Sequence, residues 1–127
     1  MKALLDTNVL LRLHLQSKKL GVRTQSLLSS ANSLFYSPLS LFELLQSEQV
    51  RPHVITDFVQ ATESIGIQEL PLTARAAMEA RRFGNLRGRD PMDFLILSQA
   101  AEAGLVLFTA DLRLLGLGLP FIKDATL

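Results

Sequence analysis

The sequence has no cysteine among its 127 residues. A disulfide framework and a thiolate metal site are therefore both excluded. A chain without cysteine suits a reducing cytoplasm, and the cytoplasm is where we expect this protein to act.

Long apolar runs and several common catalytic motifs are missing as well. No run approaches the roughly 18 residues of a membrane span, and Asp6 and Arg12 interrupt the apolar stretch that a signal peptide would need. The sequence has no Gly-rich phosphate loop, no Gly-x-Ser-x-Gly and no Ser-x-x-Lys. Nucleotide binding and acyl transfer therefore have no support.

The overall composition is that of a globular protein. Hydrophobic residues make up 48% of the chain, and the mean hydropathy is +0.26. This composition argues against disorder and predicts an extensive core in a single domain over residues 1–127. The formal net charge of +1 points to no class of partner.

Short apolar runs alternate with helical patterns along the chain. We expect strands near residues 1–5, 34–36, 67–70, 105–108 and 121–122, and helices over 9–16, 18–32, 38–48, 52–64, 74–82, 91–103 and 112–115. This order predicts an α/β fold, a three-layer α/β/α sandwich around a central parallel sheet of about five strands.

Several helix boundaries and buried faces are also predictable. Helix starts are expected at Ser37-Pro38, Thr73 and Asp90-Pro91, and a helix end at Gly104. The apolar residues expected to face the core are Leu41, Leu44 and Leu45 in one helix, and Val54, Phe58, Val59 and Ala61 in the next.

Two carboxylates follow apolar strands directly. Asp6 comes after Leu4-Leu5, and Asp111 comes after Phe108-Thr109-Ala110. Because parallel strands end at one edge of their sheet, and ligands bind in open α/β sheets at that edge, both acids are candidate site residues. Asp6 also has an ordinary explanation as a helix cap, but we expect Thr7 or Asn8 to take that role.

Three further acids have both a functional and a structural explanation. Asp90 precedes Pro91 and can serve as a helix cap, and Asp93 falls in the first turn, where an acid favours the helix dipole. Glu43 lies deeper in its helix among apolar residues, either on a narrow solvent stripe or in a site where a metal offsets its charge.

Together these acids suggest a site for a hard cation. Carboxylate oxygens suit Mg²⁺ or Mn²⁺. His14 and His53 have no partner at metal-ligand spacing, so we expect them to be surface or helix-flanking residues.

Four segments occur in order along the chain. They are Leu-Leu-Asp-Thr-Asn at 4–8, Ser-Leu-Phe-Glu-Leu at 40–44, Arg-Asp-Pro-Met-Asp-Phe-Leu-Ile-Leu-Ser-Gln-Ala at 89–100 and Phe-Thr-Ala-Asp at 108–111. With Leu70-Pro71-Leu72 ahead of the third acid, this pattern resembles a PIN domain, and more narrowly the VapC-type toxins of bacterial and archaeal toxin–antitoxin pairs. The resemblance spans essentially the whole chain.

The resemblance implies roles for particular residues. The catalytic and metal-binding quartet would be Asp6, Glu43, Asp93 and Asp111, supported by the polar residues Thr7, Asn8, Thr109 and Asp90. The sequence departs from many relatives at Arg89, where they have His, and at Phe94, where they have Arg. Neither departure removes a carboxylate, and Phe94 indicates either different packing or a partner surface.

The implied activity is Mg²⁺-dependent endonucleolytic cleavage of RNA, leaving 5′-phosphate and 3′-hydroxyl ends. With the quartet set aside, 13 basic and 8 acidic residues remain, a net charge of +5. Five arginines precede or border the third acid and are either RNA-phosphate contacts or an ordinary solvated face: Arg75, Arg81, Arg82, Arg87 and Arg89.

The resemblance also implies a homodimer and a small cognate antitoxin as partners. Apolar residues near the C-terminus and around Phe42, among them Leu114, Leu115, Leu117 and Leu119, exceed what a small core obviously needs and are candidate partner-facing residues. The alternative to an enzyme is a catalytically inactive PIN-like domain that binds RNA or protein. A phosphoacceptor switch is disfavoured, because no Lys accompanies Thr109 and Asp111 at the later strand end.

Overall fold

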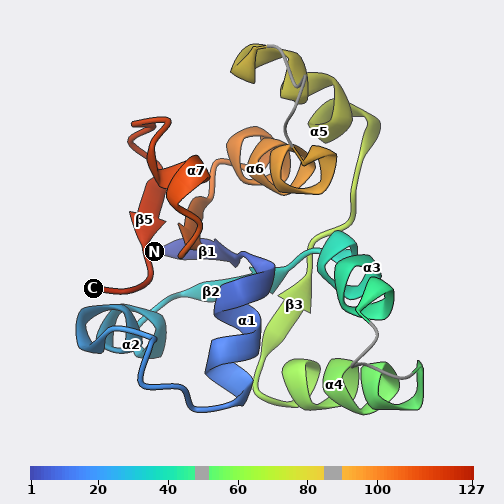
Figure 1. Ribbon diagram of the computed structural model, residues 1–127, viewed down its shortest axis with the longest axis vertical. Helices are drawn as coiled ribbons and strands as arrows, with labels where there is room; N and C mark the ends of the chain where they lie inside the picture. Colours follow the sequence, from blue (N-terminus) through green and yellow to red (C-terminus); the bar gives the residue numbers. More distant parts are fainter. Residues whose placement is uncertain (48–51, 85–89) are drawn as a thin grey trace.

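The computed structural model describes residues 1–47, 52–84 and 90–127, apart from the side chains of residues 52 and 53. Five strands form its sheet: β1 (Lys2–Leu5), β2 (Ser33–Tyr36), β3 (Ile67–Glu69), β4 (Val106–Thr109) and β5 (Ile122–Asp124). Their order is β3-β2-β1-β4-β5 and every pairing is parallel. All strands therefore end at one edge, as the alternating sequence pattern predicts (Figure 1).

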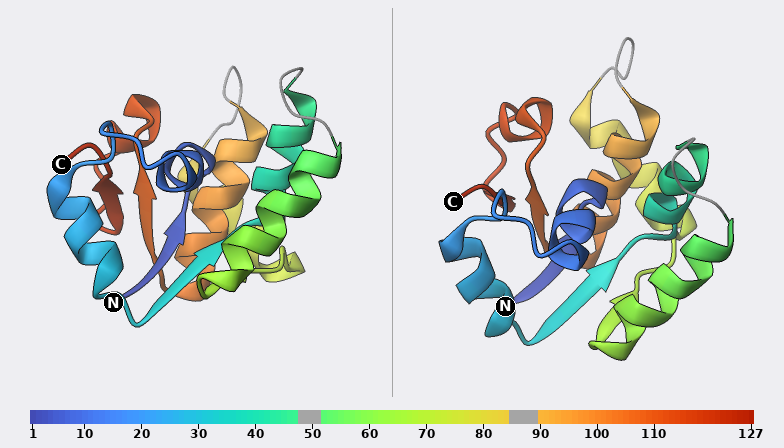
Figure 2. Two further views of the ribbon diagram at one scale, coloured as in Figure 1. Left: turned by 90° about the horizontal axis from the view of Figure 1, so that it is seen from below. Right: turned by 60° about the horizontal axis from the view of Figure 1, so that its bottom comes forward.

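Helices lie on both sides of this sheet, which confirms the expected three-layer α/β/α architecture (Figure 2). They are α1 (Thr7–His14), α2 (Val22–Ser29), α3 (Pro38–Gln46), α4 (Pro52–Ser64), α5 (Ala74–Glu79), α6 (Pro91–Ala103) and α7 (Leu112–Leu115). A 3-10 turn, η1 (Ala80–Phe83), continues α5. Among the described residues, no helix is long and apolar enough to cross a membrane.

Alternation along the central strand β1 divides the interior into two apolar clusters. Ala3 and Leu5 point to one side and pack with residues of α1 and α2. Leu4 points to the other side and packs with Leu97 of α6 and Leu114 of α7. Because β1 is covered on both faces, all three of these strand residues are fully buried.

The predicted helix boundaries agree with the observed capping contacts. The Ser37 hydroxyl accepts a hydrogen bond from Leu39 N at 3.1 Å, and Thr73 Oγ1 accepts one from Ala76 N at 3.1 Å. Asp90 Oδ1 accepts from Met92 N at 3.0 Å. Gly104 ends α6 with a φ of 68°, a left-handed conformation that glycine adopts without strain.

Two predicted helix faces are partly wrong. In α3, Leu44 is buried and Leu41 packs against the first cluster, but Leu45 is 43% exposed. In α4 the helix turns Ile55 and Thr62 inward, which leaves Val54 at 45% exposure and Ala61 exposed as well. Phe58 and Val59, also predicted to face inward, are partly buried.

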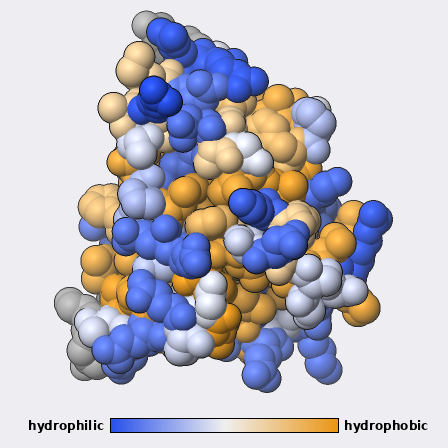
Figure 3. All heavy atoms as spheres, turned by 180° about the vertical axis from the view of Figure 1, so that it is seen from behind, coloured by the Kyte–Doolittle hydropathy of each residue, from blue (hydrophilic) through white to orange (hydrophobic). Residues whose placement is uncertain are grey.

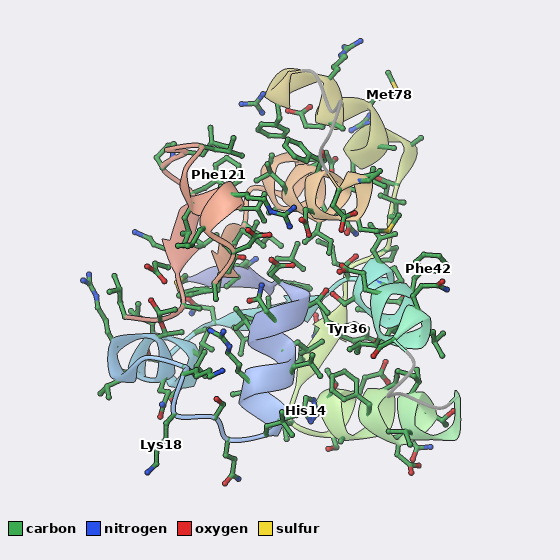
Figure 4. The ribbon with its side chains drawn as sticks, viewed as in Figure 1. His14, Lys18, Tyr36, Phe42, Met78 and Phe121 are labelled. Carbon is green, nitrogen blue, oxygen red and sulfur yellow. The ribbon has the colours of Figure 1, made fainter. Side chains whose placement is uncertain are left out.

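The burial of Thr62 is explained by its hydrogen bonds. Its hydroxyl donates to Phe58 O at 2.7 Å and lies 2.7 Å from His14 Nε2. His14 ends α1, points toward α4 (Figure 4) and packs its ring 4.2 Å from the Phe58 ring. His14 is thus a helix-flanking residue that joins α1 to α4, and its partial burial lowers its pKa. The prediction for His53 lies outside the described side chains.

The C-terminal leucines are mostly part of the core rather than a partner surface. Leu114 is buried, and Leu117 and Leu119 pack against the second cluster, so their assignment to a partner surface is wrong. Phe94 is also buried in this cluster, which selects the packing interpretation of that departure. Phe42 is half-exposed on the outer side of α3 (Figure 4). Hydrophobic and hydrophilic groups are intermixed on the face opposite to Figure 1 (Figure 3).

Candidate active site

Asp6 lies at the carboxyl end of β1 and is only 2% exposed. Its backbone N donates to Phe108 O of β4 at 3.0 Å. Its Oδ1 accepts a hydrogen bond from Thr7 N at 2.8 Å, and α1 begins at the next residue. Asp6 is therefore itself the cap of α1, and the prediction that Thr7 or Asn8 takes this role is wrong because the helix starts two residues earlier than expected.

The second oxygen of Asp6 is held by side chains from two different elements. Thr109 Oγ1, at the end of β4, donates to Asp6 Oδ2 at 2.6 Å, and Asn8 Nδ2 donates to the same atom at 3.3 Å. The Thr109 hydroxyl also accepts from Asp111 N at 3.0 Å, while Asn8 Oδ1 accepts from Ala110 N at 3.1 Å. These hydrogen bonds hold residues 109–111, at the end of β4 and just after it, against the start of α1.

Glu43 reaches the same edge from the middle of α3. Its Oε1 accepts from Thr7 Oγ1 at 3.0 Å, and Thr7 Oγ1 also lies 2.9 Å from Ser40 Oγ. Ser40 is fully buried one helical turn before Glu43. Glu43 thus points inward toward the end of β1 rather than lying on a solvent stripe.

Asp90 and Asp93 come from the first turn of α6. One carboxylate oxygen of each, and one of Glu43, all lie within 4.8 Å of one another. Asp90 is exposed and caps α6, and Asp93 is partly buried. Asp90 is therefore close enough to Glu43 and Asp93 to belong to the acidic cluster, in addition to capping α6.

Asp111 completes the group from the N-terminus of α7 and binds an arginine that the sequence patterns did not single out. Arg113 N donates to Asp111 Oδ1 at 2.9 Å, Arg113 Nε donates to the same atom at 3.3 Å, and Nη2 donates to Oδ2 at 3.0 Å. The same Nη2 donates to Asp93 Oδ2 at 3.1 Å. Arg113 therefore connects the acids of α6 and α7.

Proximity among these acids changes their pKa values. Burial, followed by the charges of Asp6, Asp90, Asp111 and Glu43, raises the pKa of Asp93 to about 7. Burial also raises the pKa of Asp6 and of Glu43, although hydrogen bonds from threonines oppose the rise in both. The pKa of Asp111 is lowered, chiefly by its hydrogen bonds from Arg113.

The donor set fits a hard divalent cation. All the converging groups are carboxylates, and the Glu43, Asp90 and Asp93 oxygens are close enough for one ion to contact them together. A bound divalent cation would also offset the charge repulsion that, after burial, raises the pKa of Asp93. A pocket of about 420 Å³ opens beside these acids and is bordered by Asp90, Asp93, Arg113, Leu112 and Leu117.

Three of the five arginines expected to contact RNA lie on α5 and η1. Arg75 on α5 and Arg81 and Arg82 on η1 are exposed. Arg82 forms an ion pair with Glu79 and lies over the Phe83 ring, 5.6 Å from its centroid. The predictions for Arg87 and Arg89 fall outside the described residues.

The sequence patterns did not identify two residues of the site, Ser40 and Arg113. Ser40 stands three residues before Glu43, and this spacing is the one sign that they share a helix face. Arg113 stands two residues after Asp111, a spacing that allows contact with a cap residue but does not predict the further contact with Asp93.

Several solved structures have the same fold at low sequence identity. VapBC-1 from nontypeable Haemophilus influenzae matches with a TM-score of 0.73 and 20% identity, covering 100% of both chains. VapBC2 from Rickettsia felis, bound to a DNA fragment from its promoter, matches with a TM-score of 0.71 and 17% identity over 97% of this chain and 98% of that one. DNA-bound VapBC from Salmonella typhimurium matches with a TM-score of 0.67 and 22% identity over 98% of each chain.

No curated protein sequence matches the chain. The family model described as the PIN domain matches residues 3–118. That match covers four of the five strands, apart from Lys2 at the start of β1, and every acid of the cluster, but not β5. The chain therefore belongs to the PIN domain family.

Proposed function

We propose that this protein is a Mg²⁺- or Mn²⁺-dependent endoribonuclease and the toxin of a toxin–antitoxin pair. The observation that carries the proposal is the convergence of carboxylates from β1, α3, α6 and α7 at the carboxyl edge of the sheet. Asp6, Glu43, Asp93 and Asp111 are the proposed metal-binding and catalytic residues, with Asp90 as a fifth carboxylate beside them. Thr7, Asn8 and Thr109 are the proposed supporting residues.

The metal would supply Lewis-acid polarisation of the phosphodiester and a more acidic water for hydrolysis. The chain's own residues then fix the geometry. Thr7, Asn8 and Thr109 hold both oxygens of Asp6, and Thr7 also orients Glu43. Such supporting hydrogen bonds orient ligand carboxylates, and they favour the ionised form against the burial that raises the pKa of Asp6 and Glu43.

Charge outside the cluster supports a nucleic-acid substrate. The chain without the quartet carries a net charge of +5. The exposed Arg75 and Arg81 could contact phosphates, whereas Arg82 is paired with Glu79. If these arginines bind RNA, replacing Arg75 and Arg81 with Ala weakens RNA affinity and lowers its dependence on salt. A salt dependence equal to that of the wild type would contradict this part of the proposal.

The matched structures support one proposed partner, an antitoxin. Those structures contain VapBC complexes or a toxin–antitoxin complex, which supports a cognate antitoxin for this chain. We also propose a homodimer that acts in the cytoplasm, and the half-exposed Phe42 and Leu45 on α3 offer apolar surface for such contacts. Co-expression with the protein encoded next to it, followed by size-exclusion chromatography, tests for the complex.

Cleavage of RNA by the purified protein tests the activity. Structured RNAs are incubated with Mg²⁺, Mn²⁺ or EDTA, and the cut ends are sequenced. We expect metal-dependent cuts with 5′-phosphate and 3′-hydroxyl ends, and loss of these cuts in Asp93→Asn. RNA binding with no cleavage under any metal would instead support the inactive binding module.

A further inference from the structure

Arg113 holds the two acids of α6 and α7 with one guanidinium group. Its Nε and Nη2 donate to separate oxygens of Asp111 at 3.3 and 3.0 Å, the forked arrangement typical of arginine and carboxylate. The same Nη2 lies 3.1 Å from Asp93 Oδ2. One nitrogen therefore bridges the carboxylates of Asp93 and Asp111.

Arg113 is the cation that balances this cluster. Within residues 1–47, 52–84 and 90–127, Asp93 and Asp111 form ion pairs with Arg113 and with no other basic side chain. The Arg113 side chain is 70% exposed, whereas those of Asp93 and Asp111 are 13% and 18% exposed. The guanidinium thus covers the acids from the solvent side.

A divalent ion held by both Asp93 and Asp111 would compete with this guanidinium for their oxygens. Mg²⁺ binds carboxylate oxygens at about 2.1 Å, and Asp93 Oδ2 and Asp111 Oδ2 already accept from Nη2. Two cations on the same pair of oxygens would be close enough to repel strongly. Binding of a metal by both acids therefore requires Arg113 to turn away into solvent.

We propose that Arg113 is a built-in counter-ion that competes with the divalent metal for Asp93 and Asp111 and so sets the metal affinity of the site. This inference rests on the proposed metal site and adds its regulation by a residue of the same chain. Arg113 neutralises the acids in the metal-free protein and raises the metal concentration at which the site fills.

The test is the dissociation constant of Mg²⁺ and Mn²⁺, measured by calorimetry on metal-free protein, together with melting temperatures in EDTA. Because exposed ion pairs are weak, we expect Arg113→Ala to bind metal roughly three- to tenfold more tightly than the wild type. The metal-free variant should melt at a lower temperature, since its acids lose their counter-ion. Arg113→Lys keeps the charge without the fork and should bind metal with intermediate affinity.

Two comparisons make the result specific. Arg23→Ala removes the same charge from an exposed position on α2 and should leave the metal affinity unchanged. In about 0.5 M KCl the difference between Arg113→Ala and the wild type should shrink, because salt screens exposed charges. An equal gain in Arg23→Ala would trace the effect to net charge and overturn the competition.

Metal binding by the wild type separates an error in the role of Arg113 from an error in the metal site. If the wild type binds metal and Arg113→Ala binds it equally or more weakly, Arg113 is not a competitor and the inference is wrong. If the wild type binds neither Mg²⁺ nor Mn²⁺, the metal site itself is wrong, and the inference falls with it.

Discussion

Thr109 donates its hydroxyl proton to Asp6 across 103 positions of sequence, with a distance of 2.6 Å from Oγ1 to Oδ2. The same hydroxyl accepts a hydrogen bond from Asp111 N at 3.0 Å. Thr109 is fully buried, so this one group ties the strand-end acid of β1 to that of β4 in a place that water does not reach.

Replacing Thr109 with Val should weaken both ends of this link. The shape is nearly kept, but Asp6 loses a donor and Asp111 N loses its acceptor, at a cost of about 1–3 kcal/mol of stability. Metal affinity should fall by roughly 10- to 100-fold, as is typical for lost supporting contacts. Thr109→Ser keeps the hydroxyl and serves as the control in chemical denaturation and calorimetry. Equal metal affinity in Thr109→Val and Thr109→Ser would show that the hydroxyl does not orient the site.

Replacing Asp6 with Asn should abolish cleavage without stabilising the metal-free protein. Repulsion between acids alone favours stabilisation, but the contacts of Asp6 oppose it. Thr7 N can only donate, so the side-chain oxygen of the new asparagine would have to take the place of Asp6 Oδ1. Its NH₂ group would then take the place of Oδ2 and face Asn8 Nδ2, which is also a donor. We expect an unchanged or lower melting temperature in EDTA. A clear rise in melting temperature would show that charge repulsion outweighs these hydrogen bonds.

The metal-free protein should lose stability as pH rises from about 4 to about 7. The pKa of Asp93 is about 7 in the folded protein, against an ordinary value of 3.8, so the folded state binds more protons than the unfolded state throughout this window. The raised pKa values of Asp6 and Glu43 act in the same direction. The lowered pKa of Asp111 acts oppositely, and its stabilising contribution is lost only on further acidification. The lowered pKa of His14 also acts oppositely, because the unfolded state takes up a proton at this ring first as pH falls below 6.5.

Melting temperatures in EDTA at several pH values test this expectation. A change of 1 kcal/mol corresponds to roughly 4 °C for a domain of this size, and we expect a fall of several degrees between pH 5 and pH 8. Asp93→Asn should flatten the profile and melt above the wild type at pH 8, because it removes the charge while keeping an acceptor for Arg113. A wild-type profile that is flat between pH 5 and pH 8 would rule out the coupled acids.

Divalent metal should reverse this loss of stability. A ligand that binds only the folded state adds about 2.7 kcal/mol at a concentration 100 times its dissociation constant. Because the ligand carboxylates must be ionised, Mg²⁺ should raise the melting temperature more at pH 8 than at pH 5. Scanning calorimetry with Mg²⁺, and with Na⁺ at matched ionic strength, separates binding from screening. The same rise in both salts would point to screening alone.

The sheet and two of its acids are predictable from the sequence for a simple physical reason. An apolar run that ends in a polar residue defines the end of a buried strand, so the positions of Asp6 and Asp111 follow from local pattern. The caps at Ser37 and Asp90 are local as well, since the capping bond spans only two residues.

Other features depend on contacts that no local pattern contains. Thr62 faces inward on α4, where it forms a hydrogen bond with His14. Leu114 is buried because α7 packs onto the second cluster. Arg113 reaches Asp93 because the fold brings the starts of α6 and α7 to the same edge of the sheet, although 20 positions separate the two residues. Each of these follows from packing between distant segments, which a single sequence does not reveal.

Anomalous diffraction from crystals grown with Mn²⁺ would locate the metal beside its ligands. We expect a peak within bonding distance of carboxylate oxygens from Asp93 and its neighbours Asp6, Glu43, Asp90 or Asp111, and no such peak in crystals of Asp93→Asn. No peak among these acids in wild-type crystals with saturating Mn²⁺, or a peak bound only elsewhere on the molecule, would contradict a metal-dependent nuclease site at this edge of the sheet.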